Sequence, residues 1–280
     1  MRARASLCIY ALLQFNKKGG KSLVNVITSR DNETIKYACK IGQSKAFRQS
    51  EQRFLAEGLK LCFDLAASLT IYKVFYTSTI RCAHPEVETL GGTHYEISDS
   101  VAQKLSDTKA PQGLFVLFAL PQKTMDEISA HGRYLCLENV QDPSNVGAML
   151  RSAAAFGFEG AVLSNGCADP FSPKGVRSSM GAAGHINVFT EVDMPAAIAA
   201  LRAKGMQVYA AALQNSVPLE TVSPAKGAGL AVVIGNEGNG LTQDTIAAAG
   251  AAVRIPITDK VESLNAAVAG AVLLWHFRGV

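Results

Sequence analysis

The chain has 280 residues, of which 48% are hydrophobic and 18% charged, a composition typical of a folded globular protein and not of a disordered one. No apolar run approaches the length of a membrane span, so we expect no transmembrane helix. The net charge of +4 conceals an asymmetry: residues 1–60 hold 12 Lys or Arg against 4 Asp or Glu, whereas the remainder holds 15 against 19. A basic front segment indicates contact with a polyanion, with a solvated surface as the alternative.

The cysteines and the first residues bear on the compartment. The cysteines are scattered without a Cys-x-x-Cys pair, so we expect no zinc site and predict buried free thiols in a reducing cytosol, hence a cytoplasmic protein; they are Cys8, Cys39, Cys62, Cys82, Cys136 and Cys167. Residues 1–25 are predicted to form an N-terminal extension, structural or disordered. Their apolar run is short and no small-residue cleavage site follows it, which argues against a signal peptide.

The front of the chain alternates short helical and strand patterns. We predict a capped helix over 29–40, a basic exposed loop over 44–50, a strand over 54–58 and a helix over 59–67. A strand over 71–76, a helix over 98–105 and a buried strand over 113–118 follow. This alternation predicts a small α/β domain over 26–121, and the polar, turn-rich residues 122–132 are predicted to be a linker.

The rear of the chain, 133–280, alternates more strictly. We expect strands at 133–137, 160–164, 186–189, 206–213 and 230–234, with a last strand ending at Ile255. Helices are expected at 146–156, near Val176, at 196–204 and at 242–249, and a last one at 264–277 with Ser263 as its N-cap. Short apolar strands separated by helices predict a parallel sheet covered on both faces. Ligands of such sheets bind beyond the carboxyl ends of the strands.

Three polar loops are expected at that edge. Residues 139–151 carry Asn145 in the first turn of a helix and Arg151 six residues later, offset around the helix axis; a surface cation is the alternative for Arg151. Residues 235–241 hold three glycines that allow close backbone approach to a ligand, with a simple tight turn as the alternative. Residues 255–269 pass from a strand through a polar loop into a helix whose free amide groups suit a ligand.

Together the three loops resemble the SpoU/TrmH family of RNA ribose 2′-O-methyltransferases, in the SPOUT class of knotted enzymes. The resemblance covers residues 133–280, and residues 172–182 are also similar to the family. The front half resembles, less specifically, an RNA-binding domain with a ribosomal-protein-like fold, through Arg48 and residues 54–58 and 108–113.

The resemblance implies a C-terminal trefoil knot, S-adenosylmethionine as methyl donor, no metal and a homodimer. It implies that the donor is bound by Gly235, Asn236, Gly240, Ile255, Ile257, Ser263 and Leu264. Arg151 would take the proton of the ribose hydroxyl, or instead position phosphate and stabilise the alkoxide. Asn145, Glu237, Ser263 and Asn265 would orient the reacting groups. RNA would be held by phosphate contacts, and the basic residues expected to make them are Arg30, Lys45, Arg48, Lys174 and Arg177.

Several functions are compatible with these features. The separate front domain favours ribosomal RNA as substrate over transfer RNA, and an antibiotic-resistance rRNA methyltransferase would have the same architecture. A non-catalytic RNA-binding assembly factor with a retained knot is disfavoured, because all five expected catalytic residues are present. A nicotinamide-dependent enzyme is disfavoured, because no glycine fingerprint occurs in a first βα unit.

Overall fold

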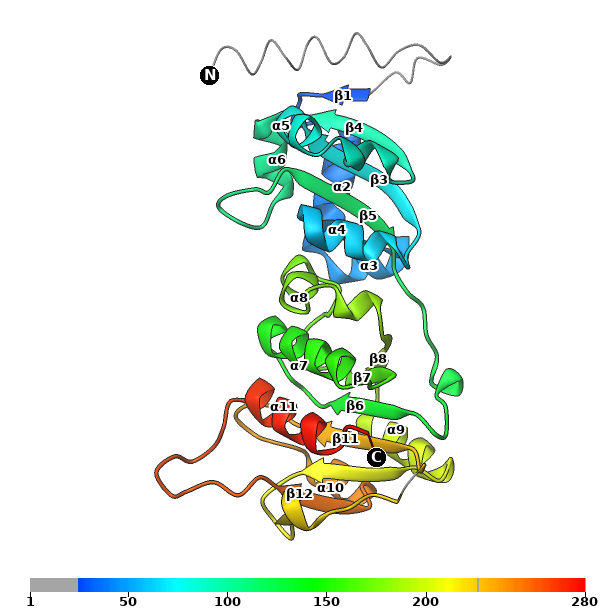
Figure 1. Ribbon diagram of the computed structural model, residues 1–280, viewed down its shortest axis with the longest axis vertical. Coiled ribbons are helices and arrows are strands. Elements are labelled where there is room, and N and C mark those ends of the chain that lie inside the picture. The colour runs from blue at the N-terminus through cyan, green and yellow to red at the C-terminus, as the bar shows by residue number, and fades with distance from the viewer. Residues whose placement is uncertain (1–24, 226, 280) are drawn as a thin grey trace.

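The computed structural model describes residues 25–225 and 227–279, which form two β-sheets stacked along the long axis of the molecule (Figure 1). The predicted N-terminal extension lies almost wholly outside these residues. Among the described residues, no helix is long and apolar enough to cross a lipid bilayer.

The front sheet has the strand order β1-β4-β3-β5-β2, in which β5 runs antiparallel to both of its neighbours. Helices α2 and α6 pack on one face of the sheet and α4 on the other. The strands are β1 (Asn25–Ile27), β2 (Arg53–Glu57), β3 (Ile71–Thr77), β4 (Thr93–Ile97) and β5 (Leu114–Ala119). The helices are α2 (Glu33–Gln43), α3 (Lys45–Glu51), α4 (Leu59–Ala66), α5 (Ser78–Ala83) and α6 (Asp99–Leu105), with the 3-10 turn η1 (Pro85–Thr89).

The predicted basic loop over 44–50 is wrong, because these residues form helix α3. Ser44 caps the helix by accepting a hydrogen bond from the amide of Phe47 at 3.2 Å. A helix of two turns is too short to show an apolar period, and its run of polar residues resembled a loop. The consequence is largest for Arg48, which is only 4% exposed.

The rear sheet has the strand order β10-β12-β9-β11-β6-β7-β8, and all of its pairs are parallel. The predicted parallel sheet is therefore confirmed. Strands such as β11 are buried along their whole length, because their apolar runs are covered on both faces. The strands are β6 (Arg133–Leu137), β7 (Gly160–Ser164), β8 (Asn187–Val192), β9 (Gln207–Ala211), β10 (Val217–Pro218), β11 (Leu230–Ile234) and β12 (Ala251–Arg254).

The helices of the rear half divide between the two faces of this sheet. Helices α7 and α11 contribute to one apolar cluster, and α9 and α10 pack on the opposite face. The helices are α7 (Pro143–Ala155), α8 (Pro173–Ser178), α9 (Met194–Ala203), α10 (Gln243–Ala248) and α11 (Ala266–His276). The 3-10 turns are η2 (Met125–Glu127), η3 (Ala182–Gly184) and η4 (Leu219–Thr221).

One apolar cluster continues from the front sheet into the rear half. Phe54 of β2 lies 5.3 Å from Phe171, centroid to centroid, and α8 packs against β2. At Gly184 a Cβ atom would collide with the side chain of Leu65 in α4. The two sheets are thus joined by packed side chains as well as by residues 120–132, which run along the side of the molecule (Figure 1).

Four cysteines are buried free thiols, as predicted: Cys39, Cys62, Cys136 and Cys167. Burial raises the pKa of the Cys136 thiol to about 12, so this side chain stays protonated and behaves as a small apolar residue. Cys82 departs from the prediction because it is disulfide-bonded, and Cys8 lies outside the described residues.

Candidate functional site

The loops after β6, β11 and β12 meet at the carboxyl edge of the rear sheet, where the parallel strand order places them. The amide of Glu138 donates to the carbonyl of Ile234 at 2.9 Å. The side-chain Nδ2 of Asn236 donates to the carbonyl of Asn139 at 2.8 Å. The predicted convergence of the first two loops is thereby confirmed, and Asn236 is one of the side chains that join them.

The glycine loop closes on itself. Asn236 and Gly240 exchange two backbone hydrogen bonds of 3.0 and 2.9 Å, and Asn236 Oδ1 accepts from the amides of Gly238 and Asn239. At Gly235 a Cβ atom would overlap the backbone carbonyl of Gly240. Glycine at 235 is therefore required by the loop's own tight turn.

Glu138 supports the loops of the site, which the sequence did not predict. Its buried carboxylate accepts hydrogen bonds from the amide and hydroxyl of Thr242, at 2.8 and 2.9 Å, and from the hydroxyl of Thr245 at 2.5 Å. These contacts fix the start of α10 next to the glycine loop. The available signal was a carboxylate directly after a buried strand, together with two threonines three residues apart at a helix start.

Polar side chains from all three loops form a chain of contacts. Asn145 Nδ2 donates to Glu237 Oε1 at 2.8 Å, and Asn265 Nδ2 donates to Asn145 Oδ1 at 3.3 Å. The structure thus brings together three of the five residues expected to be catalytic. These residues come from separate stretches of the sequence, and the hydrogen bonds show which of them are in contact.

The predicted N-cap of the last helix is wrong by two residues. Asn265, not Ser263, caps α11, with Oδ1 accepting from the amides of Ala267 at 2.9 Å and Val268 at 3.3 Å. Both residue types are good caps, and asparagine here also reaches Asn145. Ser263 stands exposed in the loop before the helix.

A cavity of about 200 Å³ lies beside this network, under the loop after β12. Its wall is mostly apolar, with Arg254, Glu262 and Ser263 as polar groups. Four of the residues expected to bind the cofactor line it, namely Ile255, Ile257, Ser263 and Leu264, with Ala211, Leu213, Val253 and Leu273 among the others. Gly235, Asn236 and Gly240 do not line it; they form the neighbouring loop.

Arg151 lies on α7, six residues or about 1.7 turns beyond Asn145, and is exposed. It makes no hydrogen bond or ion pair with any residue that the structure describes, so its guanidinium is available to a ligand. The start of α7 is fixed by Asp142, whose Oδ1 accepts from the amide of Ser144 at 2.8 Å. That hydrogen bond, with a smaller contribution from Lys174, lowers the pKa of Asp142.

Most of the cations expected to contact RNA are paired with carboxylates. Lys45 pairs with Glu191, Lys174 with Asp142 at 3.2 Å, and Arg177 with Asp107 at 2.6 Å, whereas Arg30 is exposed. These three cations are exposed or half-buried, so their ion pairs are weak and can be exchanged for contacts with another partner.

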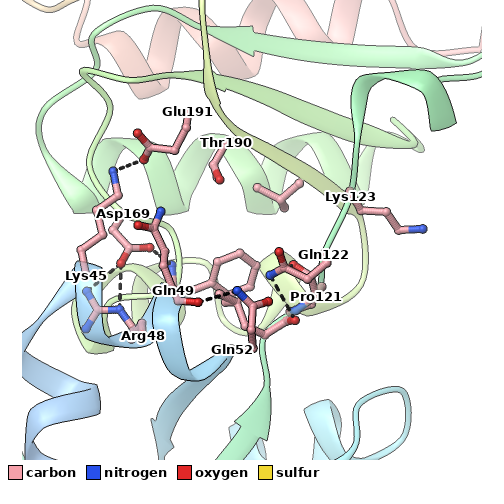
Figure 2. Close-up of a pocket in the computed structure, with 13 residues that line it drawn as sticks. Lys45, Arg48, Gln49, Gln52, Pro121, Gln122, Lys123, Asp169, Thr190 and Glu191 are labelled. Atoms are coloured by element: carbon pink, nitrogen blue, oxygen red, sulfur yellow. Dashed lines mark hydrogen bonds and ion pairs between the residues drawn. The ribbon is translucent and has the colours of Figure 1, made fainter.

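For Arg48 the structure contradicts a role in RNA contact. Its guanidinium donates to the carbonyls of Ile41 and Gly42, at 2.6 and 2.8 Å, and pairs with Asp169 of the rear half at 2.6 Å. It lies against a pocket of about 290 Å³ between the two halves (Figure 2). Because every donor group faces a protein acceptor and the side chain is buried, Arg48 connects the two halves instead.

Across residues 25–225 and 227–279, no cluster of three or more His, Cys, Asp or Glu side chains is arranged to hold a metal ion.

Comparison with known proteins gives a match for each half of the chain. Residues 132–275 match the SpoU rRNA Methylase family, and residues 32–116 match the MRM3-like substrate binding domain. The chain is 31% identical to the 23S rRNA (guanosine(2553)-2′-O)-methyltransferase RlmP of Bacillus subtilis, over 90% of this chain and 99% of that protein.

Solved structures agree with this match. An AdoMet-bound rRNA methyltransferase from Sinorhizobium meliloti superposes with a TM-score of 0.81 at 30% identity, covering 90% of this chain and 97% of that one. An RNA 2′-O ribose methyltransferase superposes with a TM-score of 0.75 at 26% identity, covering 90% and 97%.

Proposed function

The chain belongs to the SpoU rRNA methylase family, and on that premise we propose that it transfers a methyl group from S-adenosylmethionine to a ribose 2′-hydroxyl of ribosomal RNA. The observation that carries the proposal is the contact of Asn145 with Glu237 and Asn265 beside the cavity after β12. The relative from Bacillus subtilis is a 2′-O-methyltransferase of 23S rRNA. The neighbour from Sinorhizobium meliloti binds AdoMet.

The cavity fits the adenosine part of the donor. Ile255, Leu264 and Leu273 supply an apolar wall for a purine, and Glu262 and Ser263 supply polar groups for hydroxyl and amino groups. When bound, S-adenosylmethionine supplies the methyl group from its positively charged sulfonium. The polar network from Asn145 to Asn265 lies at the side of this cavity and is suited to hold the reacting groups in line.

A ribose hydroxyl is a weak nucleophile near neutral pH, so it needs positioning and stabilisation of its developing charge. We place Arg151 at this hydroxyl, because its guanidinium bonds to none of the residues that the structure describes and sits on the helix that begins with the polar network. A guanidinium stays protonated in proteins. Its role is therefore to hold the adjacent phosphate and stabilise the alkoxide, in preference to accepting the proton.

We extend the proposal to a trefoil knot and a homodimer. Two features support it. The chain leaves the sheet after β12, forms the loop 255–265, and returns to pack α11 on α7 and β11. One face of helix α11 also carries three exposed apolar side chains. The exposed fractions of Val268, Val272 and Trp275 are 51, 38 and 51%.

We also propose that residues 26–121 are the RNA-binding domain, 122–132 the linker and 133–280 the methyltransferase domain, in a cytoplasmic protein. Supporting this division, the strands of the front sheet end at Ala119 and those of the rear sheet begin at Arg133. The four buried free thiols fit a reducing compartment, whereas the disulfide at Cys82 is an exception to it.

The Arg151→Ala variant tests the proposal. We expect at least about a 100-fold loss of methyl transfer to ribosomal RNA, the size of effect seen when one stabilising donor is removed. Affinity for S-adenosylmethionine, measured by calorimetric titration, should change less than about twofold, because Arg151 does not line the cavity.

Arg151→Lys is the matched control for charge alone. A lysine keeps the positive charge but not the planar fork of donors, so we expect it to restore only part of the activity. Full activity in Arg151→Ala would contradict the assignment of Arg151 to the chemistry. No binding of S-adenosylmethionine by the wild-type protein, with or without RNA, would contradict the proposed function itself.

A further inference from the structure

One surface of the front half alternates aromatic rings with cations. It is built from α2, β2, β3 and β4, and we call it the aromatic–basic strip. Its members are Tyr37, Lys40, Arg53, Tyr72, Lys73 and Tyr95.

Within the strip, each cation lies against a ring. The Cζ of Arg53 lies 4.1 Å from the ring centroid of Tyr72 and 5.8 Å from that of Tyr37. The Nζ of Lys73 lies 5.5 Å from the centroid of Tyr95 and 5.9 Å from that of Tyr37. Tyr37 is therefore the centre of the strip, with a cation toward each neighbouring tyrosine.

Lys40 extends the strip along α2. Its Nζ lies 4.1 Å from the centroid of the Phe47 ring, which packs edge-on against Tyr37 at 5.6 Å. The three cations thus lie on one connected surface that spans a helix and three strands.

The positive charge of the strip is poorly compensated. Within the described parts of the chain, Lys40, Arg53 and Lys73 form no ion pair with a carboxylate. Arg53 donates to the hydroxyl of Tyr37 at 2.8 Å, and that hydroxyl donates to Glu51 at 2.8 Å, so one carboxylate touches the strip indirectly. The Nε of Arg53 is buried without a hydrogen-bond partner.

Two physical costs follow from this arrangement. Partial burial, and to a smaller extent the charge of Arg53, lowers the pKa of Lys73, because desolvation and a neighbouring cation both disfavour its charged form. A buried donor without an acceptor also costs free energy. A bound anion would relieve the first cost, because it would stabilise the charged form of Lys73.

The contrast with four of the five basic residues that the sequence predicted to contact RNA points to this surface. Lys45, Lys174 and Arg177 already pair with carboxylates, and Arg48 is buried. The strip instead offers unpaired cations, inside residues 32–116 that match a substrate binding domain.

We propose that the aromatic–basic strip binds single-stranded RNA, with phosphates at Lys40, Arg53 and Lys73 and a base against the ring of Tyr72. The inference rests on the proposed function, in which RNA is the substrate. Unpaired nucleotides bind to surfaces on which aromatic rings and Arg planes alternate with cations. Their bases stack on the rings and their phosphates form ion pairs with the cations. Tyr72 is 37% exposed, so its ring is accessible to a base.

The test is fluorescence anisotropy with a labelled, mixed-sequence single-stranded RNA of about 20 nucleotides, long enough to fill a binding groove. We compare the wild-type protein with a Lys40→Gln/Lys73→Gln double variant and with Tyr72→Leu. Lys36→Gln is the matched control, because Lys36 lies on the same helix but already pairs with Glu33 at 2.9 Å.

We expect the double variant to bind the RNA about tenfold more weakly and to reduce the slope of log Kd against log salt by about 1.4, roughly 0.7 for each lost phosphate contact. Tyr72→Leu should weaken binding about tenfold with an unchanged slope, because a stacking contact is lost but no charge. Lys36→Gln should change the affinity less than about twofold, as expected for an exposed cation that is already paired.

The inference is overturned by equal losses in Lys36→Gln and the double variant, or by no saturable RNA binding to the wild-type protein at about 50 mM salt, where phosphate contacts are strong. It is also overturned if RNA affinity is unchanged while binding to polyglutamate is lost, which would assign the strip to an acidic protein. Calorimetric titration with S-adenosylmethionine on the same samples separates the two proposals. Normal donor binding with unaltered RNA binding refutes the strip alone.

Discussion

Two asparagines at the carboxyl edge of the rear sheet have different tasks. Asn236 uses its whole amide inside the protein, since Nδ2 holds Asn139 and Oδ1 holds the turn of the glycine loop. Among the described residues, the Asn145 side chain forms hydrogen bonds with two other polar side chains of the site, Glu237 and Asn265, and both bonds lie near solvent. Asn236 therefore holds the loops together, whereas Asn145 belongs to the surface that faces a ligand.

Gly235→Ala should disrupt the glycine loop. The added Cβ overlaps the carbonyl of Gly240, and backbone in a turn cannot yield as a side chain does. We expect a loss of about 1–3 kcal/mol in the free energy of unfolding, measured by urea titration, with weaker binding of S-adenosylmethionine. Gly238→Ala is the control, because its Cβ would meet only the Asn236 side chain at 3.6 Å. Equal effects in the two variants would contradict this explanation.

At the residue scale the sequence predicted the polar residues that meet at the loops better than it predicted the side chains that support those loops. Asn145, Glu237 and Asn265 were predictable because the family motifs contain them, and the structure brings them into contact. Glu138 and Arg48 were not predictable in their observed roles. Their partners, Thr242 and Asp169, lie about a hundred residues away along the chain, and only folding brings them together.

At the scale of elements, helix α11 has one face that is packed against the protein and one that is exposed to solvent. One face packs on α7 so closely that a Cβ at Gly270 would collide with Met149. The other exposes Val268, Val272 and Trp275. An exposed apolar row on a helix is unfavourable in water unless a partner covers it.

Val268→Asp/Val272→Asp should convert the proposed homodimer to monomer, because two carboxylates would be buried without partners in the interface. Light scattering coupled to size-exclusion chromatography measures the mass directly. Ala247→Asp, a substitution at an exposed position of α10, controls for added charge. A dimer that persists in the double variant, or a monomeric wild-type protein, would contradict the assignment of this face.

The predicted bounds were most accurate for the strands that are most deeply buried. The strands β6, β7 and β11 begin and end at the predicted residues, because apolar runs buried on both faces have clear limits. The strands β1, β4 and β10 were not predicted; they are short and largely exposed or half-buried, so no alternation marks them. Helix α3 was missed for the same reason of length.

At the scale of the whole molecule, the Arg48–Asp169 pair fastens the front half to the rear half (Figure 2). Arg48→Met leaves Asp169 and the carbonyls of Ile41 and Gly42 without their donor. We therefore expect a loss of about 3–5 kcal/mol in the free energy of unfolding, measured by urea titration. A loss below about 0.5 kcal/mol, the range of ordinary surface substitutions, would contradict this role.

A double variant provides the control for this prediction. Arg48→Met/Asp169→Leu removes both charges, so no buried carboxylate remains unpaired. It should be more stable than Arg48→Met alone, because most of the stability lost in the single variant comes from the buried Asp169 carboxylate that is left without a cation. If the double variant is less stable than the single one, the lost stability comes from packing and not from the ion pair.

The continuous apolar core between Phe54 and Phe171 fixes the distance between the front half and the rear half of the molecule. Because the two halves share packed side chains, the span between the aromatic–basic strip and the cavity after β12 does not adjust to each RNA. If RNA binds the strip and Arg151 acts on the ribose, as proposed, only a nucleotide at one fixed distance from the strip can reach Arg151. The choice of the methylated ribose would then depend on this distance as much as on contacts with the bases.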